Sequence, residues 1–168
     1  MNMPELLHKT FYSSRMEKQV HYRIYLPSEY EKEQKAYPVL YRIYGPMEEE
    51  ADIQKAVGFA DQAIRSGKIS PMLIVLFDGE GEEVFIQEFI PFIDKEYRTA
   101  AEREGRAIEG SANGGFAALR LAVKYNNLFS SVISYDGIAD AALAKNLFSL
   151  TETCRAETGW EQTSHSAS

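Results

Sequence analysis

The segment 107–116 restricts the fold of this chain more than any other stretch. An apolar pair enters it, and a run with helical spacing leaves it. Between the two lie small residues and three glycines, Gly110, Gly114 and Gly115. Small residues allow a buried strand to turn sharply into a helix, with one side chain raised at the apex and helix N–H groups directed at it. We therefore predict a strand-to-helix turn at this point.

Strand-like and helix-like segments alternate along the rest of the chain. Two runs, Leu7–Ser14 and Gln19–Leu26, flank a polar turn and predict an antiparallel hairpin with His21 on its outer, solvent-facing side. Further strands are expected at 37–44, 71–77, 106–110 and 129–135, and helices at 51–66, 84–97, 116–125 and 139–154, with a kink or a late start at Pro91. This alternation is typical of an α/β fold whose mostly parallel sheet has helices on both faces and binds ligands at the carboxyl ends of its strands.

The composition of the chain disfavours some classes of binding partner. The chain of 168 residues has 18 Lys and Arg against 25 Asp and Glu, a net charge of −7, which disfavours nucleic acid and anionic membranes as partners. We see no signal peptide and no run able to span a bilayer, so we expect a cytoplasmic location. The acidic loop 79–83 matches no known calcium loop, and we interpret it as solvated. We expect one domain, 1–154, and a disordered polar tail, 155–168.

Several segments together carry a resemblance to a known family: Tyr25–Tyr30, Tyr37–Tyr41, Gly67–Met72, Phe89–Thr99, Arg106–Gly110 and Gly114–Phe116. As a set they resemble the putative esterase family of α/β-hydrolases, which includes esterase D (S-formylglutathione hydrolase), feruloyl esterases and enterochelin esterases. The resemblance implies an α/β-hydrolase-like fold with an N-terminal antiparallel hairpin. It also implies hydrolysis of a small acyl ester by a serine, without a cofactor or a metal.

The turn departs from the family pattern at its centre. The family writes it Gly-x-Ser-x-Gly, and the middle serine is the nucleophile. Here Ala112 holds the nucleophile position, and a serine stands one place early, at Ser111, as a candidate displaced nucleophile. The resemblance places oxyanion and binding groups at Tyr44, Gly45 and the N–H of Asn113.

The resemblance also predicts that the chain is C-terminally truncated, with its last strands missing. The family places its acid and its histidine after later strands, whereas this chain offers Asp136 as a candidate acid and His165 in the polar tail. Two readings stay open: an impaired carboxylic-ester hydrolase, or a catalytically silent hydrolase-like binding domain or fragment. Losing the later strands would expose strand 129–135 as a sheet edge, so we expect self-association there.

Overall fold

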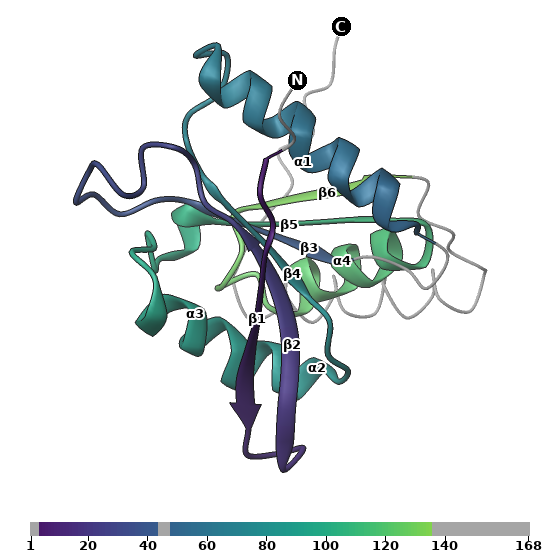
Figure 1. Cartoon of the computed structure of the whole chain (residues 1–168). Coiled ribbons are helices and arrows are strands. Elements are labelled where there is room, and N and C mark those ends of the chain that lie inside the picture. Colours follow the sequence, from purple (N-terminus) through teal and green to yellow (C-terminus); the bar gives the residue numbers. More distant parts are fainter. Residues whose placement is uncertain (1–3, 44–47, 136–168) are drawn as a thin grey trace, which may run out of the picture.

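A computed structural model of the chain describes residues 4–43 and 48–135, and a six-stranded sheet forms its centre (Figure 1). The strand order is β1-β2-β4-β3-β5-β6. The strands are β1 (Leu7–Ser13), β2 (Lys18–Tyr25), β3 (Val39–Ile43), β4 (Leu73–Phe77), β5 (Arg106–Ser111) and β6 (Ser131–Tyr135). β2 pairs antiparallel with β1 and with β4, whereas β3, β4, β5 and β6 pair in parallel. The predicted mostly parallel sheet with an N-terminal hairpin is therefore confirmed.

Helices cover both faces of the sheet (Figure 1). One face carries α1 (Glu50–Arg65), and the other carries α2 (Glu82–Val84), the π-helical turn η1 (Phe85–Phe89), α3 (Ile90–Glu96) and α4 (Ala112–Lys124). A short 3-10 turn, η2 (Arg103–Gly105), precedes β5. Within residues 4–43 and 48–135, no helix is long and apolar enough to cross a membrane. The predicted helix 139–154 and the tail 155–168 lie outside the described residues.

The core consists of one apolar layer on each face of the sheet. The larger layer joins the sheet to η1, α3 and α4 and is rich in aromatic rings, with Tyr41 and Phe89 fully buried. The smaller layer joins the sheet to α1 through Ile53, Val57 and Ile74. Strand β4 is buried along its whole length because it receives both layers. This explains the unbroken apolar run that the sequence shows there.

Strand β2 differs from its prediction. His21 is exposed as expected, but Arg23 and Tyr25, on the same side of the strand, are buried. Helix α1 covers them: Arg23 forms ion pairs with Glu50 (2.5 Å) and with Asp78 at the end of β4 (2.9 Å). The predicted solvent-facing side is wrong over this half of β2, because the strand lies inside the sheet and under a helix rather than at a free hairpin.

The segment after β4 also differs from its prediction. We expected a solvated acidic loop up to residue 83 and a helix from 84, but helical structure begins at Glu82. The predicted irregularity at Pro91 is a change of helical pitch. The five π-helical residues of η1 come first, and Pro91 lies at the start of α3, where the missing N–H of proline is tolerated.

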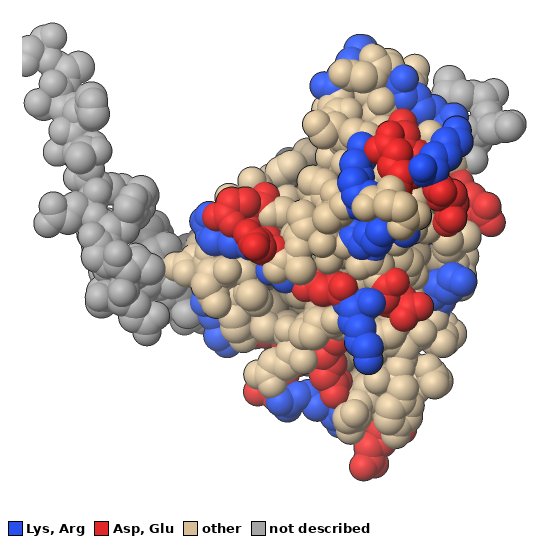
Figure 2. All heavy atoms as spheres, turned by 90° about the vertical axis from the view of Figure 1, so that its left-hand side faces the viewer, with Lys and Arg blue, Asp and Glu red and all other residues tan. Residues whose placement is uncertain are grey.

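Acidic and basic side chains are interspersed on the face that Figure 2 shows, with neither sign forming one large area. The described residues also hold no group of three or more His, Cys, Asp or Glu side chains arranged to bind a metal ion. Neither the charges on this face nor a cluster of metal-ligating side chains among the described residues therefore marks a site.

Glycines bring helix α4 close to strand β5. A Cβ atom built on Gly110 would lie 2.3 Å from the carbonyl oxygen of Gly114, and one built on Gly115 would lie 2.7 Å from Ser134 Oγ on β6. Neither contact is sterically tolerable for an ordinary side chain. The first turn of α4 is thus seated against β5 and β6, and this contact positions the strand-to-helix turn.

We expect Gly110→Ala to lower the free energy of unfolding by about 3 kcal/mol, because its methyl group meets backbone that cannot move aside. Gly67→Ala is the matched control. Gly67 has a φ of +71° but nothing within 4 Å of the added Cβ, so only backbone strain of about 1 kcal/mol is expected. Urea denaturation measures both. Equal losses for the two variants would contradict the close approach of α4 to β5.

Candidate functional site

The turn between β5 and α4 has the sharp form that the sequence predicts. Ser111 is extended, with φ −119° and ψ 150°, and the next residue, Ala112, already begins α4. Ala112 has a φ of +49°, in the left-handed region, where a residue with a Cβ pays about 1 kcal/mol. Its side chain is exposed. A methyl group therefore stands at the apex of a strained turn.

Helix α4 begins at this apex, so its first N–H groups lie beside it. The first N–H groups of a helix have no partner within the helix, and the helix dipole makes this end partly positive. Asn113 is the second residue of α4 and is exposed, and no acidic residue lies in the first turn. The turn can thus stabilise a negative charge that develops beside Ala112. The role of Asn113 as an oxyanion donor stays a prediction.

Ser111 is directed at a carboxylate. Its Oγ donates a hydrogen bond to Glu48 Oε2 at 3.1 Å. By the alternation of the strand, Ser111 shares with Glu109 the face of β5 that looks toward α1, and both side chains line a pocket there. The Ser111 hydroxyl therefore belongs to the α1 side of the sheet. Its role as a displaced nucleophile stays a prediction.

A buried guanidinium organises the polar groups next to Ser111. Arg42 on β3 donates through Nη1 to Glu109 Oε1 at 2.7 Å, and through Nη2 it forms an ion pair with Glu48. The three side chains are each about one-tenth exposed. Burial acts to lower the pKa of Arg42, but the two carboxylates outweigh it and hold the pKa above its usual value. Arg42 is therefore a permanent cation between two anions.

Sequence reasoning missed this cluster, although a signal was present. Arg42 and Glu109 are charged residues inside two predicted buried strands, and a buried charge requires a partner. The two residues lie directly opposite one another in the parallel pairing of β3 with β5. Their partnership follows from the strand register, which the sequence alone does not fix.

Most of the other predicted site residues cannot be compared with the turn. Tyr44, Gly45 and Asp136 lie outside the described residues, as does His165. His8 and His21 are exposed on the β1–β2 hairpin, and strands β4 and β3 separate that hairpin from β5. Within residues 4–43 and 48–135, therefore, no imidazole is placed at the turn.

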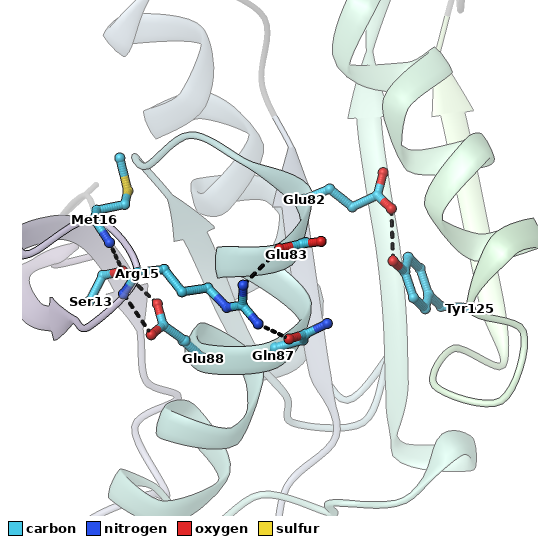
Figure 3. Close-up of polar contacts among 8 residues, drawn as sticks. All are labelled: Ser13, Arg15, Met16, Glu82, Glu83, Gln87, Glu88 and Tyr125. Atoms are coloured by element: carbon cyan, nitrogen blue, oxygen red, sulfur yellow. Dashed lines mark hydrogen bonds and ion pairs between the residues drawn. The ribbon is translucent and has the colours of Figure 1, made fainter.

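The C-terminal end of helix α4 is held by α2, the helical segment that follows β4. Glu82 accepts a hydrogen bond from the hydroxyl of Tyr125 at 2.7 Å (Figure 3). It also forms ion pairs with Arg120 at 2.5 Å and with Lys124. Burial acts to raise the pKa of Glu82, but these donors outweigh it and lower the pKa to about 2. Glu82 is thus an ionised anchor for the last turn of α4.

A second set of polar contacts joins the hairpin to the same helical segment. Glu88 accepts from Ser13 Oγ at 2.5 Å and from the backbone N–H of Arg15 at 3.1 Å. The Arg15 guanidinium reaches Glu83 at 2.7 Å and Gln87 (Figure 3). These contacts fix the tip of the hairpin on α2 and η1. Together with the contacts of Glu82, they connect α2 and η1 to the hairpin on one side and to α4 on the other.

We expect Glu82→Gln to lower the free energy of unfolding at pH 7 by about 1 kcal/mol, a figure reduced for solvent screening of its partly exposed cationic partners. The folded pKa of Glu82 is depressed, so its contribution is complete above about pH 4.5 and is lost as the pH falls toward about 2. Urea denaturation at a series of pH values between 7 and 2 measures this. The free energy of unfolding should fall less steeply with decreasing pH in the variant than in the natural chain. Glu83→Gln, which removes one exposed ion pair, is the control. An unchanged slope in Glu82→Gln would contradict the anchor.

Comparison with known protein families identifies relatives of the chain. The family model described as "Putative esterase" matches residues 13–88 and 82–167. Esterase Rv1288 of Mycobacterium tuberculosis is 30% identical over 155 residues, which cover 82% of this chain and 33% of that protein. An endo-1,4-beta-xylanase/feruloyl esterase of Xylanibacter ruminicola is 32% identical over 143 residues, covering 71% of this chain and 20% of that protein. The chain thus spans about a third or less of the length of these relatives.

Solved structures give the same fold. A ferulic acid esterase superposes with a TM-score of 0.70 at 26% identity, covering 78% of this chain and 59% of that one. The feruloyl esterase module from Clostridium thermocellum has a TM-score of 0.72 at 21% identity, covering 95% and 64%. An S-formylglutathione hydrolase from Staphylococcus aureus has a TM-score of 0.66 at 13% identity, covering 92% and 75%. The last two likenesses, both under 25% identity, show the α/β-hydrolase-like fold alone.

Proposed function

Because the chain belongs to the family described as "Putative esterase", we propose that it is a serine-esterase-like domain. Its β5–α4 turn binds small acyl esters but hydrolyses them only weakly. The observation that carries this proposal is Ala112 at the apex, with its φ of +49°. The backbone has the geometry in which α/β-hydrolases raise a nucleophile, and the side chain there has no hydroxyl.

The expected size of the impairment follows from the chemistry. Ester hydrolysis of this type needs an activated hydroxyl, a base and N–H donors for the oxyanion. Removing the nucleophile costs about 10⁶ in turnover, and about 10³ of rate enhancement remains from binding and the oxyanion site. The first N–H groups of α4, including that of Asn113, have no partner within the helix and support retention of this residual part.

A displaced nucleophile is the second candidate, and one observation favours it. Ser111 Oγ already donates to a carboxylate, Glu48, and a carboxylate can act as a general base. However, the same carboxylate is ion-paired with Arg42, which stabilises its charge and weakens it as a base. We therefore favour weak hydrolysis at a turn that lacks its nucleophile. Hydrolysis by Ser111 is the alternative that the following experiment distinguishes.

We expect Ala112→Ser to raise the turnover of p-nitrophenyl acetate by about 10²-fold. The nucleophile together with its base raises turnover by about 10⁶-fold, of which the base supplies up to about 10⁴-fold. A serine without that base should therefore recover the remaining factor of about 10². Ala112→Gly is the control for relief of the backbone strain and should leave the rate unchanged. Ser111→Ala should also leave it unchanged.

Two outcomes would overturn this proposal. Turnover by the natural chain that disappears in Ser111→Ala would show a displaced nucleophile. A natural chain and an Ala112→Ser variant that are both indistinguishable from buffer, while both stay folded, would favour the catalytically silent binding domain.

We also propose that the chain self-associates through strand β6. In the described part of the sheet, β6 is the last strand and pairs only with β5. Its apolar side chains Val132, Ile133 and Tyr135 are 36–49% exposed. An apolar strand with an open edge is a template for pairing with another chain.

Light scattering over a range of concentrations tests this association. We expect the natural chain to dimerise at micromolar concentration and Ile133→Lys to stay monomeric, because a charge on an edge strand opposes pairing. Thr10→Lys, on the opposite edge strand β1, is the matched control and should leave the dimer intact. A natural chain that is monomeric at all concentrations would contradict the proposal.

A further inference from the structure

A pocket of about 420 Å³ lies between α1 and the sheet, on the face opposite α4. Its walls are apolar and come from the sheet and from α1: Leu40, Ala56, Val57, Ala60 and Ile74. Two aromatic side chains add to this lining, Phe59 of α1, which is 69% exposed, and Tyr135 of β6, which is 49% exposed. This size and apolar lining are typical of small-molecule sites.

The polar part of the pocket carries a net negative charge. Arg42, Glu109 and Ser111 line it, and Glu48 lies directly behind them as the second partner of Arg42. One guanidinium between two carboxylates leaves a charge of −1. The carboxylate and guanidinium side chains are each about one-tenth exposed. A net charge in so buried a place is unfavourable unless another charge compensates it.

One oxygen of this cluster remains open. Glu109 Oε1 accepts from Arg42 Nη1 at 2.7 Å, but none of the described residues donates a hydrogen bond to Glu109 Oε2. Both terminal nitrogens of Arg42 are already engaged by carboxylates. Arg42 Nε has no partner either, but it is sealed from solvent and does not reach the pocket space. From the described residues, the pocket therefore has an open acceptor and no free cationic donor.

We propose that this pocket binds a small organic cation, an ammonium group on an apolar body. The ammonium group would donate to Glu109 Oε2 and neutralise the cluster, because a buried carboxylate is best satisfied by a hydrogen-bonded charge. The apolar body would lie between the sheet and α1. Phe59 and Tyr135 would contact the ligand with their rings, which attract cations and apolar groups alike. An anion is excluded by the net charge of −1.

This site is independent of ester hydrolysis. Ser111 lines the pocket and directly precedes Ala112, but no pocket contact needs a nucleophile at the apex. An Ala112→Ser variant should therefore bind the cation with the affinity of the natural chain. Failure of the ester assay and failure of cation binding are consequently separate results.

Isothermal titration calorimetry with 2-phenylethylammonium chloride tests the proposal, and 3-phenylpropionate is the probe of opposite charge. We expect the full chain to bind the ammonium compound and not the carboxylate. Glu109→Gln should weaken binding about tenfold, the size expected for loss of one charged partner. Phe59→Ala should weaken it about fivefold through loss of the aromatic contact.

Two variants keep the result interpretable. Phe59 is exposed, so its truncation leaves the core intact even if Glu109→Gln disturbs folding; circular dichroism checks both variants. Glu83→Gln removes an exposed carboxylate on α2, away from the pocket, and should leave the affinity unchanged. The proposal is overturned if the ammonium compound does not bind, if the carboxylate binds equally well, or if Phe59→Ala and folded Glu109→Gln bind as the natural chain does.

Discussion

The close packing of α4 on β5 is the constraint on which the rest of this structure depends. Gly110 and Gly114 approach so closely that a single methyl group would overlap backbone. To begin at that distance, α4 must start within one residue of the end of β5, and Ala112 takes a left-handed conformation as a result. The strain of about 1 kcal/mol is offset by the burial of Phe116, Ala118 and Leu121 along α4. The apex is therefore imposed by the scaffold and does not depend on which side chain it carries.

The spacing of apolar residues and the positions of glycines predicted those elements whose structure depends mainly on neighbouring residues in the sequence. The hairpin, the buried strand Leu73–Phe77 and helix α1 follow from periodicity, and the sharp turn follows from its glycines. The burial of Arg23 and Tyr25 did not follow, because it depends on a helix that arrives from elsewhere in the sequence. The π-helical turn before Pro91 was missed for a similar reason, since the sequence marks an interruption without saying which form it takes.

Of the candidate site, the sequence could predict the position of Ala112 but not the polar groups beneath it. The pairing of Arg42 with Glu109 depends on the register of β3 against β5. Glu48 joins them from the segment after β3, and Ser111 adds its hydroxyl to the same carboxylate. Ser111, the candidate displaced nucleophile, thus forms its hydrogen bond on the α1 side of the sheet. The same network gives the neighbouring pocket its charge, so one set of residues borders both the turn and the proposed cation site.

We infer that the apex of the turn carries no nucleophile, because Ala112 stands there. Incubation with a fluorophosphonate, which reacts covalently with activated serines, tests it directly when the intact mass and the labelled peptide are measured. We predict that the natural chain keeps its mass of 19.0 kDa and that Ala112→Ser gains one label, which fragmentation of the peptide assigns to residue 112. Labelling of the natural chain at Ser111 would contradict it.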